Sequence, residues 1–172
     1  MNYIFKSKEF NLRWLKPNDA KNIYEKIQDE QIFKYITSIP QPYTLQNAKD
    51  FIKKSLEKLE KKEGYEFVIE IDNELQGVIG LAIKKEHNKA ELGYWISKDM
   101  RGKGIVTSAV KQIIKYGFNK LKLKRIYARF LDNNTSSERV MQKVGMTKEG
   151  VMKKASLHQG KYHDKTMYAI IN

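Results

Sequence analysis

The sequence contains no cysteine, which excludes a disulfide framework and any metal site built from thiolates. Proline occurs only 3 times in 172 residues, and no stretch is rich in proline, glycine and serine. A linker is therefore not expected, and the length suits one domain over residues 1–172. No apolar run approaches the roughly 20 residues of a membrane helix, and the N-terminus lacks a signal-peptide core. These absences predict a cytoplasmic protein with no membrane partner.

Negative charge is also scarce, because 33 Lys and Arg residues face 20 Asp and Glu residues, a net charge of +13. A positive field favours acidic ligands such as a phosphate-bearing cofactor, nucleic acid, a ribosomal particle or an acidic protein surface. Much of the excess lies between Lys53 and Lys62, where lysines alternate with Glu57 and Glu60. That alternation is typical of a solvated helix face, which is the interpretation we favour for this segment.

Hydrophobic periodicity predicts strands and helices along the first half of the chain. Polar and apolar residues alternate at 10–15, as in a strand, and apolar residues recur at helical spacing over 45–62. Thr44 is a candidate cap for the second of these elements. The other elements expected in this half are a helix that opens at Pro17, a short helix at 30–35, and strands at 65–71, 75–84 and 91–96.

The second half of the chain continues with alternating elements. A long helix is expected after Gly104, and the strand at 125–130 would then be reached by a parallel crossover. The segment Asp132-Asn133-Asn134-Thr135 is expected to turn and to cap a helix that runs to about Lys143. The last expected elements are strands at 146–153 and 166–171, with a polar loop at 154–165 between them. This order indicates an α+β protein with a mixed sheet.

A short basic loop with two glycines joins the strand at 91–96 to the long helix. Backbone N–H groups at the start of a helix have no partners within it, and the helix dipole adds partial positive charge there. Gly102 and Gly104 remove the Cβ atoms that would keep a ligand from those amides, while Arg101 and Lys103 add charge. These features predict a phosphate or pyrophosphate site.

This loop does not follow the common nucleotide-binding patterns. It lacks the Gly-Lys-Ser/Thr of a Walker loop, and Thr107 stands where a dinucleotide fingerprint has glycine. The segment 101–106, Arg-Gly-Lys-Gly-Ile-Val, instead resembles the Arg/Gln-x-x-Gly-x-Gly/Ala signature of the GNAT acyltransferase superfamily. It departs from that signature at Val106, so only the backbone amide of Val106 is expected to meet a ligand.

A second segment carries the same resemblance. Asn134, Ser137, Val140 and Lys143 are spaced as in the GNAT pattern Asn-x-x-Ser/Ala-x-x-aliphatic-x-x-Lys. Two motifs in the expected order and on the expected elements are more specific than either alone. The residues at 92–96 and 145–150 further resemble the sequence of the ribosomal-protein N-acetyltransferase branch, of the RimJ/RimL type. The resemblance covers nearly the whole chain and is strongest from 91 to 150.

The resemblance implies a single N-acetyltransferase (GNAT) domain over 1–172. Its central sheet would be mostly antiparallel, splayed between two parallel strands and flanked by helices. Acetyl-CoA is implied as the co-substrate, with no metal; the loop amides would hold its pyrophosphate, and the strand at 91–96 would pair with its pantetheine arm. The residues implied in cofactor binding are Trp95, Ile96, Arg101, Gly102, Lys103, Gly104, Val106, Thr107, Asn134 and Lys143.

Two residues are candidates for catalysis. Glu91 lies on the strand leading to the site and is the candidate base, directly or through water; alternatively it is a surface carboxylate paired with a lysine. Many family members carry a Tyr acid where this chain has Met141. Resemblance to the RimL-like branch assigns that role to Ser137. Alternatively, the Ser137 hydroxyl caps the helix or contacts the cofactor, and coenzyme A leaves as the thiolate without an acid. His163 and Asp164 are lesser candidates for the base.

The resemblance implies direct attack of a primary amine on the thioester in a ternary complex. The favoured acceptor is a protein N-terminus, including that of a ribosomal protein. A polyamine or antibiotic is the alternative, against which the positive charge argues mildly. A different class is a non-catalytic basic module for ribosome or nucleic acid, with Arg129 and Arg139 in its patch, although no known nucleic-acid-binding motif is present. A third possibility is a protein that keeps the fold and the cofactor site but has lost catalysis. The sequence is compatible with either a monomer or a homodimer.

Overall fold

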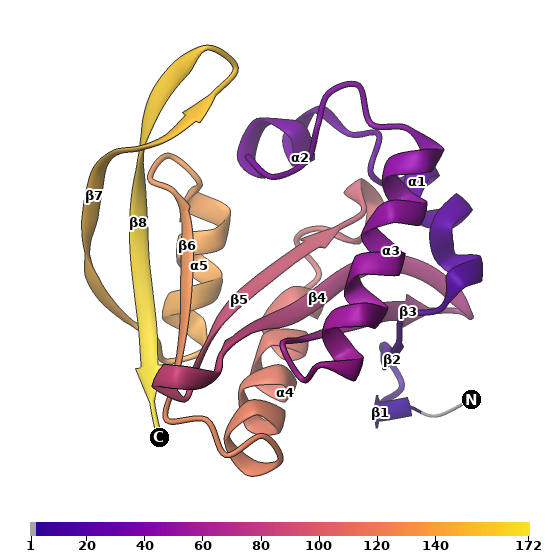
Figure 1. Ribbon diagram of the computed structural model, residues 1–172, viewed down its shortest axis with the longest axis horizontal. Helices are drawn as coiled ribbons and strands as arrows, with labels where there is room; N and C mark the ends of the chain where they lie inside the picture. The colour runs from indigo at the N-terminus through magenta and orange to yellow at the C-terminus, as the bar shows by residue number, and fades with distance from the viewer. Residues whose placement is uncertain (1–2) are drawn as a thin grey trace.

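An eight-stranded sheet organises the computed structural model, which describes residues 3–172 (Figure 1). The strand order is β1-β2-β3-β4-β5-β6-β8-β7, and every neighbouring pair is antiparallel except β5 and β6, which run parallel. The strands are β1 (Tyr3–Lys6), β2 (Asn11–Trp14), β3 (Gly64–Ile71), β4 (Glu74–Lys84), β5 (Lys89–Ile96), β6 (Arg125–Leu131), β7 (Thr147–His158) and β8 (Lys161–Ile171). This mixed sheet confirms the predicted fold class.

Helices cover both faces of the sheet, with α1, α2 and α3 on one face and α4 and α5 on the other (Figure 1). They are α1 (Ala20–Lys26), α2 (Glu30–Tyr35), α3 (Leu45–Glu60), α4 (Ile105–Asn119) and α5 (Thr135–Lys143). Short 3-10 turns occupy Pro17–Asp19, Lys85–His87 and Lys98–Met100. Among residues 3–172, no helix has both the length and the apolar character needed to cross a membrane.

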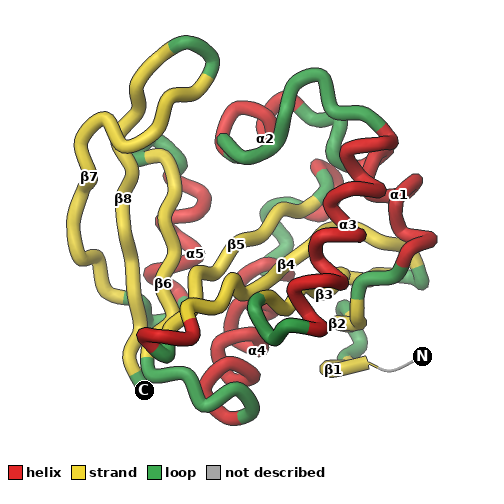
Figure 2. The backbone as a smooth tube through the Cα atoms, viewed as in Figure 1, coloured by secondary structure: helices red, strands yellow, loops and turns green. Residues whose placement is uncertain are grey.

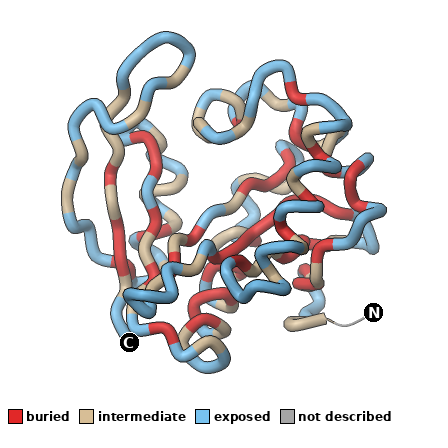
Figure 3. The backbone as a smooth tube through the Cα atoms, in the orientation of Figure 1, coloured by how far each residue is buried: buried red, intermediate tan, exposed pale blue. Residues whose placement is uncertain are grey.

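The alternation of side chains along the strands divides the core into two clusters, one on each face. Phe67 and Ile79 point to the α4 face, where they belong to one cluster with Ile113. Val68 and Val78 point to the opposite face and to the helices α1 and α3. Figure 3 shows the buried stretches following the central strands and the inner side of α4. Both layers are thus anchored to the same strands.

Side-chain caps explain where three helices begin. The Thr44 hydroxyl accepts from the backbone N–H of Asn47 at 3.2 Å, and Asp29 caps α2 in the same way. The side-chain oxygen of Asn134 accepts from Ser137 N at 3.1 Å. These bonds satisfy amides that have no partner within the helix. The cap predicted at Thr44 is confirmed, and within the predicted capping segment 132–135 the capping residue is Asn134.

Two expectations about strands were wrong or incomplete. The expected polar loop at 154–165 belongs instead to a long hairpin, in which β7 and β8 pair out to the turn at Gln159 and Gly160 (Figure 2). Both turn residues have positive φ, 48° and 74°. This end of the hairpin extends past the core, so its strands need no apolar face and carry no hydrophobic signal. The short edge strand β1 was also missed.

The two parallel strands separate after a short ladder. β5 and β6 pair only from Lys89–Arg125 to Glu91–Tyr127, and then diverge (Figure 1). Beyond this point β5 pairs with β4 alone and β6 with β8 alone. The polar backbone groups that face each other across the opening therefore have no strand partner in the described structure. This opening positions the candidate active site.

A buried ion cluster ties the N-terminal strands to the start of α1. Arg13 lies between Asp19 and Glu70, and its guanidinium donates to Asp19 at 2.8 and 2.9 Å. The side chains of Arg13 and Asp19 are each 7% exposed. Arg13 is the cation that the two carboxylates share, so removing it would leave Asp19 and Glu70 buried with uncompensated charge, which is strongly destabilising.

We therefore expect Arg13→Ala to lower the free energy of unfolding by about 3 kcal/mol, measured by urea denaturation. Lys21→Ala is the control, because it breaks the exposed pair with Glu25 at 3.8 Å and should change stability little. Equal effects of the two variants would contradict a structural role for the cluster.

Candidate active site

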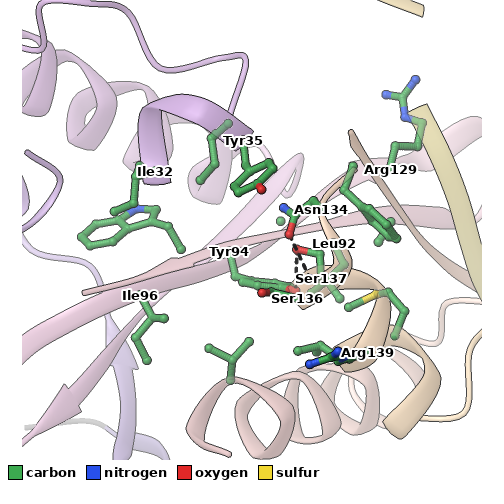
Figure 4. A pocket seen from close by; sticks show the side chains of 18 of the residues that line it. Ile32, Tyr35, Leu92, Tyr94, Ile96, Arg129, Asn134, Ser136, Ser137 and Arg139 are labelled. Atoms are coloured by element: carbon green, nitrogen blue, oxygen red, sulfur yellow. Dashed lines mark hydrogen bonds between the residues drawn. The ribbon is translucent and has the colours of Figure 1, made fainter. Parts of the chain in front are cut away.

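A cavity of about 830 Å³ occupies the opening between β5 and β6 (Figure 4). Its walls come from α2 and the segment that follows it, from β3 to β6 and β8, from the first turn of α4, and from α5. It brings together Glu91, Trp95, Ile96, Arg101, Gly102, Gly104, Val106, Thr107, Asn134, Ser137 and Lys143. Of the residues that the sequence predicts to bind the cofactor, only Lys103 lies outside this lining.

The first turn of α4 presents free backbone amides to the cavity. Gly102 and Gly104 have φ of 75° and 79°, a left-handed conformation that favours glycine, and no atom lies within 4 Å of either Cβ position. The helix has no side-chain cap, and Ser108 N is bonded to Gly104 O at 3.1 Å. The amides of 105–107 precede that bond and are left for a ligand. This cradle fits a pyrophosphate.

The two basic residues of the loop, Arg101 and Lys103, differ in their contacts. Arg101 forms an ion pair with Asp29 at 3.0 Å and donates to the carbonyl of Ile96 at 3.3 Å. Burial raises the pKa of Asp29, but Arg101 and the α2 amides outweigh it, so the pKa is lowered. Lys103 is exposed, with Nζ 3.8 Å from Met100 Sδ. Arg101 thus couples the loop to α2, and a phosphate role for either side chain stays a prediction.

The last residues of β5 present their backbone to the opening. The Trp95 side chain packs among the α1–α3 helices, and that of Ile96 packs on the opposite face with α4. Their side chains are thus used in the two cores. What they offer a ligand is the strand edge on the β6 side, which suits pairing with an extended amide-bearing arm.

Asn134 and Ser137 lie at the start of α5, on the far side of the opening (Figure 4). Since the Asn134 oxygen caps the helix, its amide nitrogen is the group left for a ligand. Ser137 Oγ accepts a hydrogen bond from the Tyr94 hydroxyl at 3.2 Å. Burial raises the pKa of Tyr94 to about 12, although the bond to Ser137 lowers it in part. Tyr94 is therefore a protonated donor at neutral pH.

The sequence analysis did not single out Tyr94. In the sequence, Tyr94 alternates with Leu92 and Ile96, so the three side chains share the α4 face of β5. This alternation does not mark Tyr94 as a site residue. Met141, at the position of the family's usual Tyr, is fully buried. The structure therefore supplies a phenol to this region from β5 rather than from α5.

Glu91 lines the cavity, but Arg129 already holds its carboxylate. The Arg129 guanidinium donates to the two carboxylate oxygens at 2.9 and 2.7 Å, and the Tyr127 hydroxyl lies 3.4 Å away. The carboxylate is thus paired with an arginine rather than with the lysine considered above. A role as base stays a prediction, and it would compete with this ion pair.

The lesser candidates His163 and Asp164 lie outside the cavity lining. Asp164 forms an ion pair with Lys153 at 2.8 Å, whose hydrogen bond lowers the pKa of the carboxyl group. The His163 ring stands 6.2 Å from that of His158. These groups belong to the β7–β8 hairpin, and within residues 3–172 no cluster of His, Asp and Glu is arranged to hold a metal ion.

Glu66 on β3 also lines the cavity, and periodicity did not distinguish it from the rest of its strand. Burial raises the pKa of Glu66 to about 7, against the opposing effect of Lys58. Among the described residues, no hydrogen bond or ion pair holds its carboxylate. A sequence signal was present, because Glu66 interrupts the apolar side of a strand that alternates into the core at Val68.

The family profile described as "Acetyltransferase (GNAT) domain" matches residues 9–147. "Probable N-acetyltransferase YjcK" of Bacillus subtilis (strain 168) is 34% identical, over 98% of this chain and 97% of the relative. "Putative ribosomal N-acetyltransferase YdaF" of the same organism is 28% identical, over 96% and 92%. These matches show that the chain belongs to the GNAT acetyltransferase family and is an N-acetyltransferase by class.

Solved structures agree with this assignment. The microcin C7 self-immunity acetyltransferase MccE, in complex with acetyl-CoA and AMP, matches with a TM-score of 0.88 and 25% identity, covering 96% of this chain and 94% of that one. RimL, a ribosomal L7/L12 α-N-protein acetyltransferase in complex with coenzyme A, matches with a TM-score of 0.90 at 22% identity, covering 99% and 98%. The RimL match shows a shared fold, as the sequence analysis predicts.

The raised pKa of Glu66 predicts a pH-dependent stability. A carboxyl group whose folded pKa is raised destabilises the fold when ionised, so wild type loses stability as pH rises from about 4.5 through 7. Glu66→Gln cannot ionise and avoids this loss. We expect the variant to be more stable than wild type by about 2–3 kcal/mol at pH 8 and by little near pH 4.5, in urea denaturation. A stability difference that does not change with pH would contradict this expectation.

Proposed function

We propose that this protein transfers an acetyl group from acetyl-CoA to a primary amine, the N-terminal amine of a protein, ribosomal proteins included. The observation that carries the proposal is the uncapped start of α4, which opens into a cavity between two diverging strands. The name of YdaF supports the ribosomal acceptor. We further expect the protein to act in the cytoplasm, where such acceptors are made.

Each part of the cavity suits one part of acetyl-CoA. The amides of 104–107 would bind the pyrophosphate, and the free edge of β5 would pair with the amides of the pantetheine arm. The Asn134 amide nitrogen, which the helix cap leaves free, would contact the same arm. Arg139 and Lys143 on α5 add positive charge to this side of the cavity. Anchoring at several points orients the thioester for attack.

Acetyl-CoA supplies an activated acyl group, and the chain supplies position, donors and a proton acceptor. A backbone N–H near Trp95 or Ile96 would stabilise the oxygen that becomes negative during attack. Ser137, hydrogen-bonded to Tyr94, would donate a proton to the leaving thiolate, and Tyr94 would restore it. The acceptor ammonium must lose a proton before it attacks, and Glu91, the candidate base from the sequence, is held by Arg129.

The β7–β8 hairpin shapes the acceptor side of the cavity. His158 Nε2 lies 2.7 Å from the carbonyl oxygen of Phe33, and Gln159 donates to Gln41 at 3.2 Å. These contacts tie the hairpin tip to α2 and the segment that follows it. An acceptor side bridged in this way has room for the end of a peptide chain or a small amine rather than for a folded loop.

Peptides with free N-termini should therefore be acetylated in preference to peptides with blocked N-termini and internal lysines.

The first test of the proposal is acetyl-CoA binding by calorimetry to wild type and Gly104→Glu. The variant should lose saturable binding, because its carboxylate would occupy the anion cradle and repel phosphate. Gly160→Glu is the matched control, since Gly160 also has a positive φ, of 74°, but lies in the hairpin turn away from the α4 cradle. Loss of binding in both variants, or in neither, would contradict the assignment of the cradle.

A second test addresses the leaving group. Ser137→Ala should lower kcat about tenfold or more, and Tyr94→Phe should have a smaller effect of the same kind, with acetyl-CoA affinity retained. Stopped-flow measurement of thiol release at saturating substrates checks this. Unchanged thiol release in Ser137→Ala would show that coenzyme A leaves as the thiolate without an acid from the protein.

A further inference from the structure

Glu66 lies at the end of a gap in the α3 face of the sheet. Cross-strand pairing places Glu66 opposite Gly80 on β4, and Gly80 opposite Gly93 on β5. A Cβ on Gly80 would overlap the Glu66 carboxylate, so that carboxylate lies directly over β4. The absence of a side chain at Gly80 is what lets Glu66 reach toward β5.

The other end of this gap is open. Gly93 is exposed, and no atom lies within 4 Å of its Cβ position. Glu66, Gly80 and Gly93 all line the large cavity. Two neighbouring glycines therefore form a bare floor that runs from the Glu66 carboxylate to the point where β5 leaves β6.

The spacing of the strands sets the distance along this floor. Neighbouring strands lie about 4.8 Å apart, so about 10 Å separates the Cα atoms of Glu66 and Gly93. Because the carboxylate already lies over Gly80, about one strand spacing, about 5 Å, separates it from the space above Gly93. This interval accommodates an ammonium group in contact with the carboxylate, or one bridging water.

The surroundings leave Glu66 as the less engaged carboxylate of the cavity. Its wall toward α3 is formed by Trp14, Leu15, Ser55, Leu56 and Leu59. Lys58 is the charged group on α3 that acts on it, without forming an ion pair. The other charged groups on this face of the opening are Glu91 and Arg129, which neutralise each other, and Lys165, which donates to the Thr37 hydroxyl at 3.5 Å.

Glu66 is also on the correct face for an acceptor. The α4 cradle lies on one face of the sheet, and Glu66 shares the opposite face with Val68. Phosphates bound at the cradle would leave the thioester in the opening, accessible from the Glu66 face. An amine entering from that side passes over Gly93.

We propose that Glu66 is the catalytic base of this enzyme, which takes the proton of the acceptor ammonium over Gly93, directly or through one water. The inference rests on the proposed acetyl transfer. The ion pair of Glu91 with Arg129 then shapes the mouth of the gap rather than accepting the proton.

The ammonium R–NH₃⁺ gives one proton to the Glu66 carboxylate, which later releases it to solvent. The nitrogen lone pair forms the C–N bond at the thioester carbonyl, and the C–S bond breaks with its electron pair on sulfur. The nitrogen loses a second proton to solvent as the amide forms, the thiolate gains one from Ser137, and solvent restores the Ser137 proton through Tyr94, so the products are the amide, the thiol and one proton in solvent.

The test measures kcat/KM against pH for wild type, Glu66→Gln, Glu66→Asp and Glu91→Gln. The acceptors are synthetic peptides with N-terminal serine, alanine or methionine, and spermidine. Glu66→Gln should lose about 100-fold in kcat/KM with its acetyl-CoA affinity unchanged by calorimetry. Because the pKa of Glu66 is about 7, wild type should show an ascending limb near pH 7 that Glu66→Gln lacks. Glu66→Asp should keep that limb at a reduced rate.

Glu57→Gln, the same change at an exposed position on α3, is the control and should behave as wild type. An active wild type with the limb intact in Glu66→Gln and lost in Glu91→Gln would overturn the proposal in favour of Glu91. A limb intact in both variants would overturn it in favour of deprotonation by solvent. A wild type that binds acetyl-CoA yet acetylates none of the amines would instead overturn the proposed function, on which this inference depends.

Discussion

The separation of β5 from β6 after three residue pairs is the constraint on which the rest of the site depends. A parallel ladder continued to the strand ends would satisfy the backbone groups of both strands and close the sheet. Its early end leaves a strand edge exposed and lets a cavity of about 830 Å³ open between the two faces. The helices that begin beside this opening, α4 and α5, direct their first turns into it. One interruption of pairing therefore creates the strand edge, the cavity and its helix-terminal amides together.

The opening has a different electrostatic character on each face. On the α4 side lie the uncapped amides of 105–107 with Arg139 and Lys143, which favour the phosphates of an anionic substrate. On the α3 side, Glu66 contributes a carboxylate without an ion-pair partner among the described residues. The net charge of +13 thus describes the molecule as a whole but not the acceptor face. A cationic amine and an anionic co-substrate are separated by the sheet and meet only where it is open.

Much of the fold and the phosphate cradle follow from local sequence features. The helix after Gly104, the cap at Asn134 and the crossover to β6 each depend on residues close together in the chain. The contacts of Arg101 with Asp29 and of Tyr94 with Ser137 join segments that are distant in the sequence. Hydrophobic periodicity predicts secondary structure but does not identify such side-chain partners. Glu66 was missed for the same reason, since its setting depends on glycines of two other strands. The tip of the β7–β8 hairpin lies beyond the core, where apolar alternation is not required.

The central claim is that acetyl-CoA occupies the opening between β5 and β6 with its phosphates at the start of α4. Backbone amide NMR spectra of nitrogen-15-labelled protein, recorded during titration with acetyl-CoA, test it most directly. The account predicts saturable shifts that are largest at the amides of 104–107 and along 92–96. Saturable binding with shifts confined to the lysine-rich exposed face of α3 would contradict it.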